Sequence, residues 1–346
     1  IYIYEEEFSV GNTRKSIKGI IARVQLEEFS KGIILPHEFT LSKAKEDRLN
    51  LMKATNCNFS QIYALYMDEK HTTLATIDEQ SKAKADLEFT DETGVTHRLW
   101  IETDEEIIAK LVADFADRKL YIADGHHRYE TALNYRNYCR ENGISKPGDP
   151  QDFQMIYLVD MEHPGLVVFP THRLVRDLPN FDKEAVLEKC SEFFYIDEKE
   201  GTDTMEEDLK KLYDEGKKAF GFYCGKGEWF LLTLKNIDFM SQMLPDVSKA
   251  SQSLDVSVLH TLILEKIFGI DKENMAKQIN LTYTKFFTEA IDGVDKGEFQ
   301  CSFVLNPTRV TEIRDVAAAG EKMPQKSTYF YPKMITGMVR NNLGVD

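Results

Sequence analysis

Apolar and polar residues alternate along the beginning of the chain in the manner of β-strands. The pattern covers residues 1–4 and 17–24, with the turn residues Gly11 and Asn12 between them. The first predicted strand starts directly at Ile1, without a methionine, so we expect further residues upstream. The same pattern predicts strands at 61–67, 155–159, 166–170, 279–283 and 299–305, and hairpins at 84–103 and 219–234.

Apolar residues at helical spacing predict helices between these strands. The clearest combination is a short buried strand at 119–123 followed directly by a helix at about 127–139, which the Asn-Gly pair at 142–143 ends. The polar residues 124–128 therefore occupy a strand-to-helix turn. Further helices are predicted at about 41–55, 104–115, 183–193, 204–215, 256–268, 271–278, 286–296 and 309–319.

The order of strands and helices predicts a mixed α/β protein without internal repeats. A linker at 145–150 contains two prolines and a glycine and marks a candidate domain boundary. We therefore expect a core domain at 1–145, an inserted smaller α+β domain at 146–250, and a C-terminal α/β segment at 251–346 that completes the first domain's site.

The composition limits the classes of function. The chain of 346 residues has a net charge of −15, and no block of basic residues offsets it. This argues against a nucleic-acid partner. No run of about 18 apolar residues exists that would span a membrane. The odd number of cysteines, five, never forms a C-x-x-C pair, which is typical of reduced thiols in a cytoplasmic protein.

The turn Asp124-Gly125-His126-His127-Arg128 is the strongest candidate site. A glycine permits a sharp turn, and the first backbone N–H groups of a helix have no intrahelical partner, so such a turn binds anions, phosphate above all. Arg128 can grip phosphate oxygens bidentately and the two histidines can donate hydrogen bonds. Asp124 is a candidate ligand for Mg²⁺. A zinc site and a solvated turn are the alternatives.

Three further motifs carry candidate chemistry. Glu38 follows Pro36-His37 at the entrance to a predicted helix, where a carboxylate is often only a cap. Lys326, Ser327 and Thr328 offer a cation and two hydroxyls in a loop bounded by prolines, which suits a carboxylate or phosphate but is also ordinary for a surface connection. His172 and Arg173 end a predicted strand and either extend an anion site or form a structural ion pair.

Three motifs, taken in order, resemble those of the free serine kinases of the ParB/sulfiredoxin-like superfamily. They are Pro36-His37-Glu38, the turn at 124–128, and Gly320-Glu321 with Pro324, Lys326 and Thr328. Over its whole length, with 167–173 and Leu254-Asp255-Val256, the chain resembles the domain of unknown function 1015 family. The resemblance implies a ParB/sulfiredoxin-like nucleotide-binding core.

The kinase resemblance also implies roles for individual residues. Asp124, Gly125, His126, His127 and Arg128 would receive the nucleotide phosphates, and Glu38 would be the general base. Lys326 and Thr328 would recognise the amino acid. Apart from the resemblance, Ser327 in the same loop and the pair His172 and Arg173 are further candidates for binding the substrate. Tyr329 and Phe330 follow Thr328 where the archaeal kinases have Arg and His, so the implied acceptor is L-serine or a related hydroxylated metabolite.

The predicted function is therefore that of a phosphotransferase with ATP or ADP as the phosphoryl donor and Mg²⁺ as cofactor. Its partners would be a nucleotide and a small hydroxylated metabolite, with neither nucleic acid nor membrane. Two alternatives stay open: a nucleotide-binding regulatory protein of the ParB-like type, and a metal-dependent hydrolase.

Overall fold

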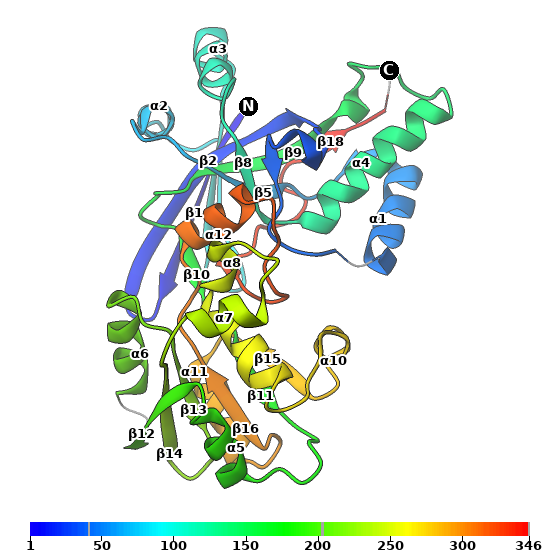
Figure 1. The fold of residues 1–346 in the computed structure, drawn as a ribbon. Helices are drawn as coiled ribbons and strands as arrows, with labels where there is room; N and C mark the ends of the chain where they lie inside the picture. Colours follow the sequence, from blue (N-terminus) through cyan, green and yellow to red (C-terminus); the bar gives the residue numbers. More distant parts are fainter. Residues whose placement is uncertain (41, 202–203, 345–346) are drawn as a thin grey trace. The chain divides into compact units, whose positions relative to one another are not determined.

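The computed structural model describes residues 1–40, 42–201 and 204–344 (Figure 1). Residues 1–167 and 330–346 form one structural unit, and residues 168–329 form a second. The chain passes between them in β10 (Val167–Phe169) and again in β17 (Tyr329–Tyr331). The predicted α/β class is confirmed. Leu41, the first residue of one predicted helix, lies outside the described residues.

An eight-stranded mixed sheet forms the centre of the first unit, in the order β3-β8-β5-β9-β2-β1-β7-β6. Two neighbouring pairs, β3 with β8 and β5 with β9, are parallel, and the other pairs are antiparallel. The strands are β1 (Tyr2–Val10), β2 (Thr13–Gln25), β3 (Ile34–Leu35), β5 (Ile62–Tyr66), β6 (Leu87–Thr90), β7 (Thr96–Ile101), β8 (Leu120–Asp124) and β9 (Phe153–Asp160).

The helices of this unit are α1 (Ser42–Thr55), α2 (Thr72–Gln80), α3 (Glu105–Asp114) and α4 (His126–Glu141), with 3₁₀ turns at Phe29–Lys31 and Pro150–Asp152. The sequence pattern predicted α1, α3 and α4 and missed α2. Helices α1 and α4 lie side by side (Figure 1). Apolar residues of α4, among them Tyr129, Ala132 and Leu133, share one core cluster with Ile34, Ile62 and Ile122 of the sheet. A short pair, β4 (Cys57–Asn58) and β18 (Asn341–Asn342), completes the unit.

The second unit is built on a six-stranded antiparallel sheet, in the order β12-β14-β13-β16-β11-β15. Two separate apolar clusters pack around it. The strands are β11 (His172–Val175), β12 (Phe194–Glu200), β13 (Ala219–Tyr223), β14 (Glu228–Leu234), β15 (Leu281–Thr284) and β16 (Cys301–Val304). The helices are α5 (Lys183–Cys190), α6 (Met205–Asp214), α7 (Asp238–Met243), α8 (Lys249–Gln252), α9 (Asp255–Val258), a π-helix (Leu259–Glu265), α10 (Lys272–Lys277), α11 (Phe287–Asp295) and α12 (Val310–Ala318).

The two units differ from the three predicted segments. Strand β9 pairs with β5 and β2, so residues 146–167 stay with the first sheet instead of opening an insert. Strands β15 and β16 pair with β11 and β13, so the inserted unit continues to Tyr329 rather than ending near 250. The linker at 145–150 is therefore a connection within one unit.

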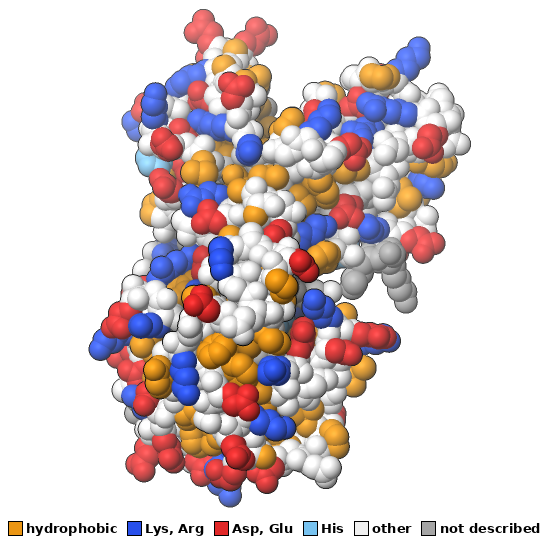
Figure 2. Space-filling model, in the orientation of Figure 1, with side chains coloured by type: hydrophobic (Ala, Val, Ile, Leu, Met, Phe, Trp, Pro, Cys, Tyr) orange, Lys and Arg blue, Asp and Glu red, His pale blue; other side chains and the backbone are white. Residues whose placement is uncertain are grey.

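Charged side chains of both signs are interspersed on the face drawn in Figure 2, so the net negative charge is not gathered into one patch there. Among the described helices, none combines the length and the apolar composition that crossing a bilayer requires. All five cysteines are free thiols, and three of them are buried.

Candidate functional site

Glu38 and the turn at 124–128 come together because two strands run in parallel. Ile34 of β3 pairs with Leu120 of β8, and Leu35 pairs with Tyr121. The carboxyl ends of neighbouring parallel strands meet at one edge of a sheet, which is where ligands bind in open α/β sheets. Residues 36–38 follow β3 and residues 124–128 follow β8, so both motifs lie at this edge.

Helix α4 begins immediately after Gly125, whose φ of 100° lies in the left-handed region that favours glycine. A Cβ atom at this position would lie 2.9–3.1 Å from the guanidinium of Arg128. Glycine therefore makes the turn possible and also leaves room for the arginine to fold back across it. His126, His127 and Arg128 form the first turn of the helix, as the sequence pattern predicted, and their backbone N–H groups lie at its N-terminal end.

His126 lies between the two motifs and is only 2% exposed. The backbone N–H of His37 donates to its Nε2 atom over 3.2 Å. Its Nδ1 atom lies 3.6 Å from Oε2 of Glu38, whose side chain is 36% exposed. Because Nε2 accepts a hydrogen bond, the ring proton belongs on Nδ1, facing the carboxylate. Both ring nitrogens of His126 therefore have contacts within the protein.

His37 is buried beneath this arrangement. Its ring lies edge-on to that of His126, with 4.6 Å between the centroids. Burial lowers the pKa of His37 to about 4, against the opposing effect of a hydrogen bond to the backbone of Ile122. His37 is therefore neutral at physiological pH, and its contacts with His126 help to fix the position of that ring.

Two cations flank the carboxylate of Asp124. Nη2 of Arg128 donates to Oδ2 over 2.8 Å, and Nζ of Lys333 donates to Oδ1 over 2.9 Å. Burial disfavours the charge of Asp124, but Lys333 and Arg128 outweigh it and hold the pKa of this carboxyl below its ordinary value. Arg128 also donates to the carbonyl of Gln61. The edge thus concentrates positive charge around one ionised carboxylate.

Asp124 is the candidate carboxylate for Mg²⁺ at this edge, and both of its oxygens accept hydrogen bonds, one from Arg128 and one from Lys333. Mg²⁺ takes one or two protein carboxylates and completes its shell with water and substrate phosphates. Asp124 would have to exchange its bond to Lys333 for the ion. Within the described ranges, no cluster of three or more His, Cys, Asp or Glu side chains is arranged to hold a metal.

The predicted substrate residues Lys326, Ser327 and Thr328 belong to the second unit. Lys326 is exposed and has a φ of 57°. The Ser327 hydroxyl donates to the carbonyl of Pro324, and Thr308 Oγ1 donates to the carbonyl of Ser327 over 2.8 Å. A hydrogen bond within the loop and one from Thr308 therefore hold the loop, while the lysine side chain is exposed.

His172 and Arg173, at the start of β11, are almost completely buried. Arg173 Nη2 donates to the carbonyl of Lys326 over 3.1 Å and lies 3.2 Å from Nε2 of His260. Burial lowers the pKa of Arg173 to about 10, so it stays charged at neutral pH, whereas burial and that charge lower the pKa of His172 to about 3. Arg173 thus supports the backbone of the 326–328 loop.

Sequence reasoning missed two residues of the first unit's site. Lys333 directly follows the proline that ended the recognised loop motif, and only the return of residues 330–346 to the first sheet brings it to Asp124. Glu130, one turn into α4, accepts from Thr40 Oγ1 and from Lys45 Nζ, both over 2.7 Å. It ties the segment after Glu38 to the helix. Neither residue gave a signal in the sequence, because both act through contacts between distant segments.

Most of the chain matches the model of a known family. Residues 1–257 match the model of a family described as protein of unknown function (DUF1015). The chain belongs to this family. This match confirms the resemblance to the DUF1015 family that the sequence motifs indicated. None of the curated proteins compared with it matches.

Three solved structures have a similar course of the chain. A conserved hypothetical protein from Pyrococcus furiosus is 15% identical, with 94% of this chain and 95% of the other covered and a TM-score of 0.42. A free serine kinase in complex with AMP is 13% identical, with 92% and 91% covered and a TM-score of 0.43. SbnI from Staphylococcus aureus, truncated at its C-terminus, is 9% identical, with 92% and 85% covered and a TM-score of 0.42.

Proposed function

We propose that this DUF1015 protein is a nucleotide-dependent phosphotransferase that phosphorylates the hydroxyl group of a small metabolite, L-serine or a related compound. One observation carries the proposal: the parallel pairing of β3 with β8, which brings Glu38 to the edge where α4 begins. A candidate base and a candidate phosphate-binding turn are thus neighbours, with 3.6 Å between Glu38 and His126.

The donor half of the site consists of Asp124, Gly125, His126, His127 and Arg128. Phosphoryl transfer requires mainly positioning and neutralisation of the phosphate charge. The N–H groups at the start of α4, the guanidinium of Arg128 and the ammonium of Lys333 supply positive charge. The backbone N–H of His126 belongs to the donor turn, while its side chain, which contacts His37 and Glu38, is assigned to orienting the base.

The reaction follows from these positions. The Glu38 carboxylate accepts the proton of the acceptor hydroxyl, and the hydroxyl oxygen forms a bond to the terminal phosphorus of the donor. The bond between that phosphorus and the bridging oxygen breaks, and the nucleotide leaves with one phosphate fewer. Mg²⁺, held by Asp124 and the phosphates, would neutralise charge on the donor.

Lys326, Ser327 and Thr328, together with His172 and Arg173, are proposed to recognise the acceptor, as the kinase resemblance and the sequence motifs suggest. The exposed ammonium of Lys326 suits the carboxylate of an amino acid. Arg173 holds the Lys326 carbonyl and is therefore assigned to positioning rather than direct contact. Whether ATP or ADP is the donor is decided by assay, with both nucleotides tested against L-serine and other hydroxylated metabolites.

The base is tested with the variant Glu38→Gln, which keeps the size of the side chain and removes its ability to accept a proton. We expect a loss of at least about 10²-fold in the rate of transfer, the typical contribution of general base catalysis, while ADP affinity changes little. Transfer is measured as phosphorylated product and affinity by titration calorimetry. Glu105→Gln, an exposed change in α3, is the control.

An unchanged rate in Glu38→Gln would reject the assignment of the base. A wild-type protein that binds neither ADP nor ATP would reject the proposed function as a whole.

A further inference from the structure

Arg173 of β11 is a buried cation of the second unit, and its partners are all neutral. The residue is 1% exposed. Its guanidinium donates to the backbone carbonyls of Thr171 and Lys326 and lies 3.2 Å from Nε2 of His260. The ring of Tyr283 faces it, with 5.5 Å between the ring centroid and the guanidinium carbon. Among the described residues, no carboxylate oxygen lies within 4.0 Å of the Arg173 nitrogens.

Two other cations with little exposed side chain do have a carboxylate partner. The side chains of Arg136 and Lys218 are 9% and 15% exposed. Arg136 contacts Glu28, and Nζ of Lys218 lies 2.9 Å from Oδ1 of Asp255. A protein interior normally holds a charge only when an opposite charge compensates it. Arg173 departs from this pattern, which points to a use for its charge.

His260 holds the guanidinium without cancelling this charge. It lies in the π-helix Leu259–Glu265, directly after the Leu254-Asp255-Val256 motif, and is 6% exposed. Helical turns of this rare type are frequent at functional sites. Burial and the charge of Arg173 lower the pKa of His260 well below its ordinary value. The ring is therefore neutral, and its Nε2 atom accepts from Arg173.

The guanidinium also lies against the backbone of the loop that is proposed to recognise the acceptor. Nη2 of Arg173 is 3.1 Å from the carbonyl oxygen of Lys326. The φ of Lys326 is 57°, in the left-handed region that residues other than glycine seldom adopt, so the backbone here needs support from outside the loop. Arg173 gives this support and adds a second positive charge to the exposed ammonium of Lys326. An uncompensated charge in the interior attracts an anion more strongly than a charge in water.

We propose that His260 is a positioning residue for the acceptor loop. It holds Arg173 against the Lys326 carbonyl and, being neutral, leaves the charge of Arg173 to attract an acceptor with an anionic group such as a carboxylate. The inference rests on the proposed function and adds to it the role of His260, which no motif in the sequence indicated.

Support of the loop is tested by limited trypsin digestion of the full chain, with cleavage after Lys326 followed by mass spectrometry. His260→Leu removes the acceptor of the bond from Arg173 and is expected to raise the cleavage rate about tenfold. His260→Gln keeps an acceptor oxygen and is expected to restore the wild-type rate. Cleavage after Lys226, a second exposed lysine with a left-handed backbone (φ 55°), is the internal control. Equal rates after Lys326 in all three proteins would reject the positioning role.

The use of the charge is tested with His260→Glu, because a carboxylate at this position keeps a bond to Arg173 and cancels its charge. Titration calorimetry in the presence of ADP compares L-serine with L-serinamide, in which a neutral amide replaces the carboxylate. We expect His260→Glu to weaken L-serine binding about tenfold and to leave L-serinamide binding unchanged. Gln278→Glu, an exposed change in the same unit, controls for the added negative charge. Melting temperatures verify that each variant is folded.

A purely structural role of His260 predicts the opposite result, since a carboxylate would hold Arg173 at least as well. Unchanged L-serine affinity in folded His260→Glu, or an equal loss for both ligands, would therefore overturn the attraction of an anion by Arg173. A wild-type chain that binds ADP but binds both acceptors equally, or neither, would overturn it as well. Failure of the wild type to bind ADP or ATP would instead reject the proposed function, and the cleavage rates after Lys326 would still decide the positioning role.

Discussion

Buried polar residues of the first sheet form a connected group away from the candidate site. The Tyr4 hydroxyl donates to Glu6 over 3.0 Å and lies 2.7 Å from Nδ1 of His97. The other ring nitrogen of His97 lies 3.1 Å from Asp91. Glu6 and His97 are each 1% exposed, so the group has hydrogen bonds but almost no water. A buried carboxyl in such surroundings favours its neutral form.

Burial raises the pKa of Glu6 from its ordinary 4.5 to about 8, against the opposing hydrogen bond from Tyr4. Between these two values the folded state holds a proton that the unfolded chain releases, so the free energy of unfolding falls as the pH rises from about 5 to 9. Glu6→Gln removes this dependence. We expect the variant to be more stable than the wild type at pH 9, on the order of 5 kcal/mol, with the difference closing near pH 5.

Thermal unfolding across this pH range measures the effect. Glu79→Gln, whose side chain is 64% exposed, is the control and should follow the wild type at every pH. A constant difference between Glu6→Gln and the wild type from pH 5 to 9 would contradict a raised pKa at Glu6.

Helix α4 connects the fold to the candidate site, since its first turn carries the residues proposed to bind phosphate and its buried face packs on the sheet. Glycines lie at both of its ends. Gly125 and Gly143 have φ values of 100° and 68°, so each is in the left-handed region. A Cβ at Gly125 would contact Arg128, whereas a Cβ at Gly143 would meet no atom within 4 Å. The two positions therefore separate backbone strain from displacement of the arginine.

Gly125→Ala and Gly143→Ala are each expected to lower the free energy of unfolding by about 1–2 kcal/mol, because alanine disfavours a positive φ. Only Gly125→Ala is expected to weaken pyrophosphate binding as well, by about tenfold or more, since it displaces Arg128. Denaturant titration gives the stability and calorimetry gives the affinity. Equal pyrophosphate affinity in both variants would show that the position of Arg128 does not matter for binding.

At the scale of the whole molecule, the last residues of the chain return to the first unit after the insert. Phe330 is 1% exposed, and its ring packs against Tyr63 with 5.7 Å between the centroids. Leu343 belongs to the same unit's core, and Lys333 reaches Asp124. The first unit therefore depends on residues that are more than 150 positions away from the rest of it.

Phe330→Ala should therefore destabilise the first unit, by about 3–5 kcal/mol for a buried phenylalanine. The two tryptophans make this measurable, because Trp100 lies in the first unit and Trp229 in the second. Fluorescence of Trp100 in a Trp229→Phe background reports on the first unit during unfolding in denaturant. Phe286→Ala, at a side chain that is 49% exposed in the second unit, is the control. A midpoint unchanged by Phe330→Ala would mean that the C-terminal segment contributes little.

Local chemistry explains what the sequence could predict. The hairpin turn at Gly11-Asn12, the strand–turn–helix around Gly125 and most helices follow from glycine, polar turn residues and apolar spacing, which act over a few neighbouring positions. The motifs around Glu38 and Asp124 were visible for the same reason, and the structure brings these two together. The roles of the remaining predicted residues stay predictions.

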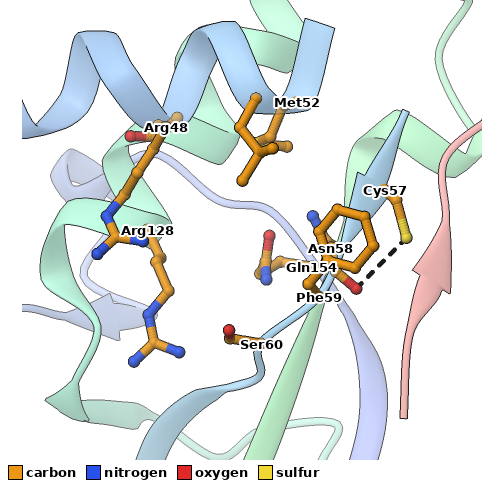
Figure 3. Close-up of a pocket in the computed structure, with 10 residues that line it drawn as sticks. Arg48, Met52, Cys57, Asn58, Phe59, Ser60, Arg128 and Gln154 are labelled. Atoms are coloured by element: carbon orange, nitrogen blue, oxygen red, sulfur yellow. Dashed lines mark hydrogen bonds between the residues drawn. The ribbon is translucent and has the colours of Figure 1, made fainter. Parts of the chain in front are cut away.

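Tertiary structure alone decided the rest. No local pattern reveals that β9 joins the first sheet, that the insert ends at Tyr329, or that Lys333 pairs with Asp124 across 209 positions. Arg48, Phe59 and Gln154, which line one shallow hollow (Figure 3), likewise come from three separate segments. The sequence by itself determined which side chains are available for chemistry, because that is a property of single residues and short motifs. Their partners were decided by strand pairing, which links residues irrespective of their distance along the chain.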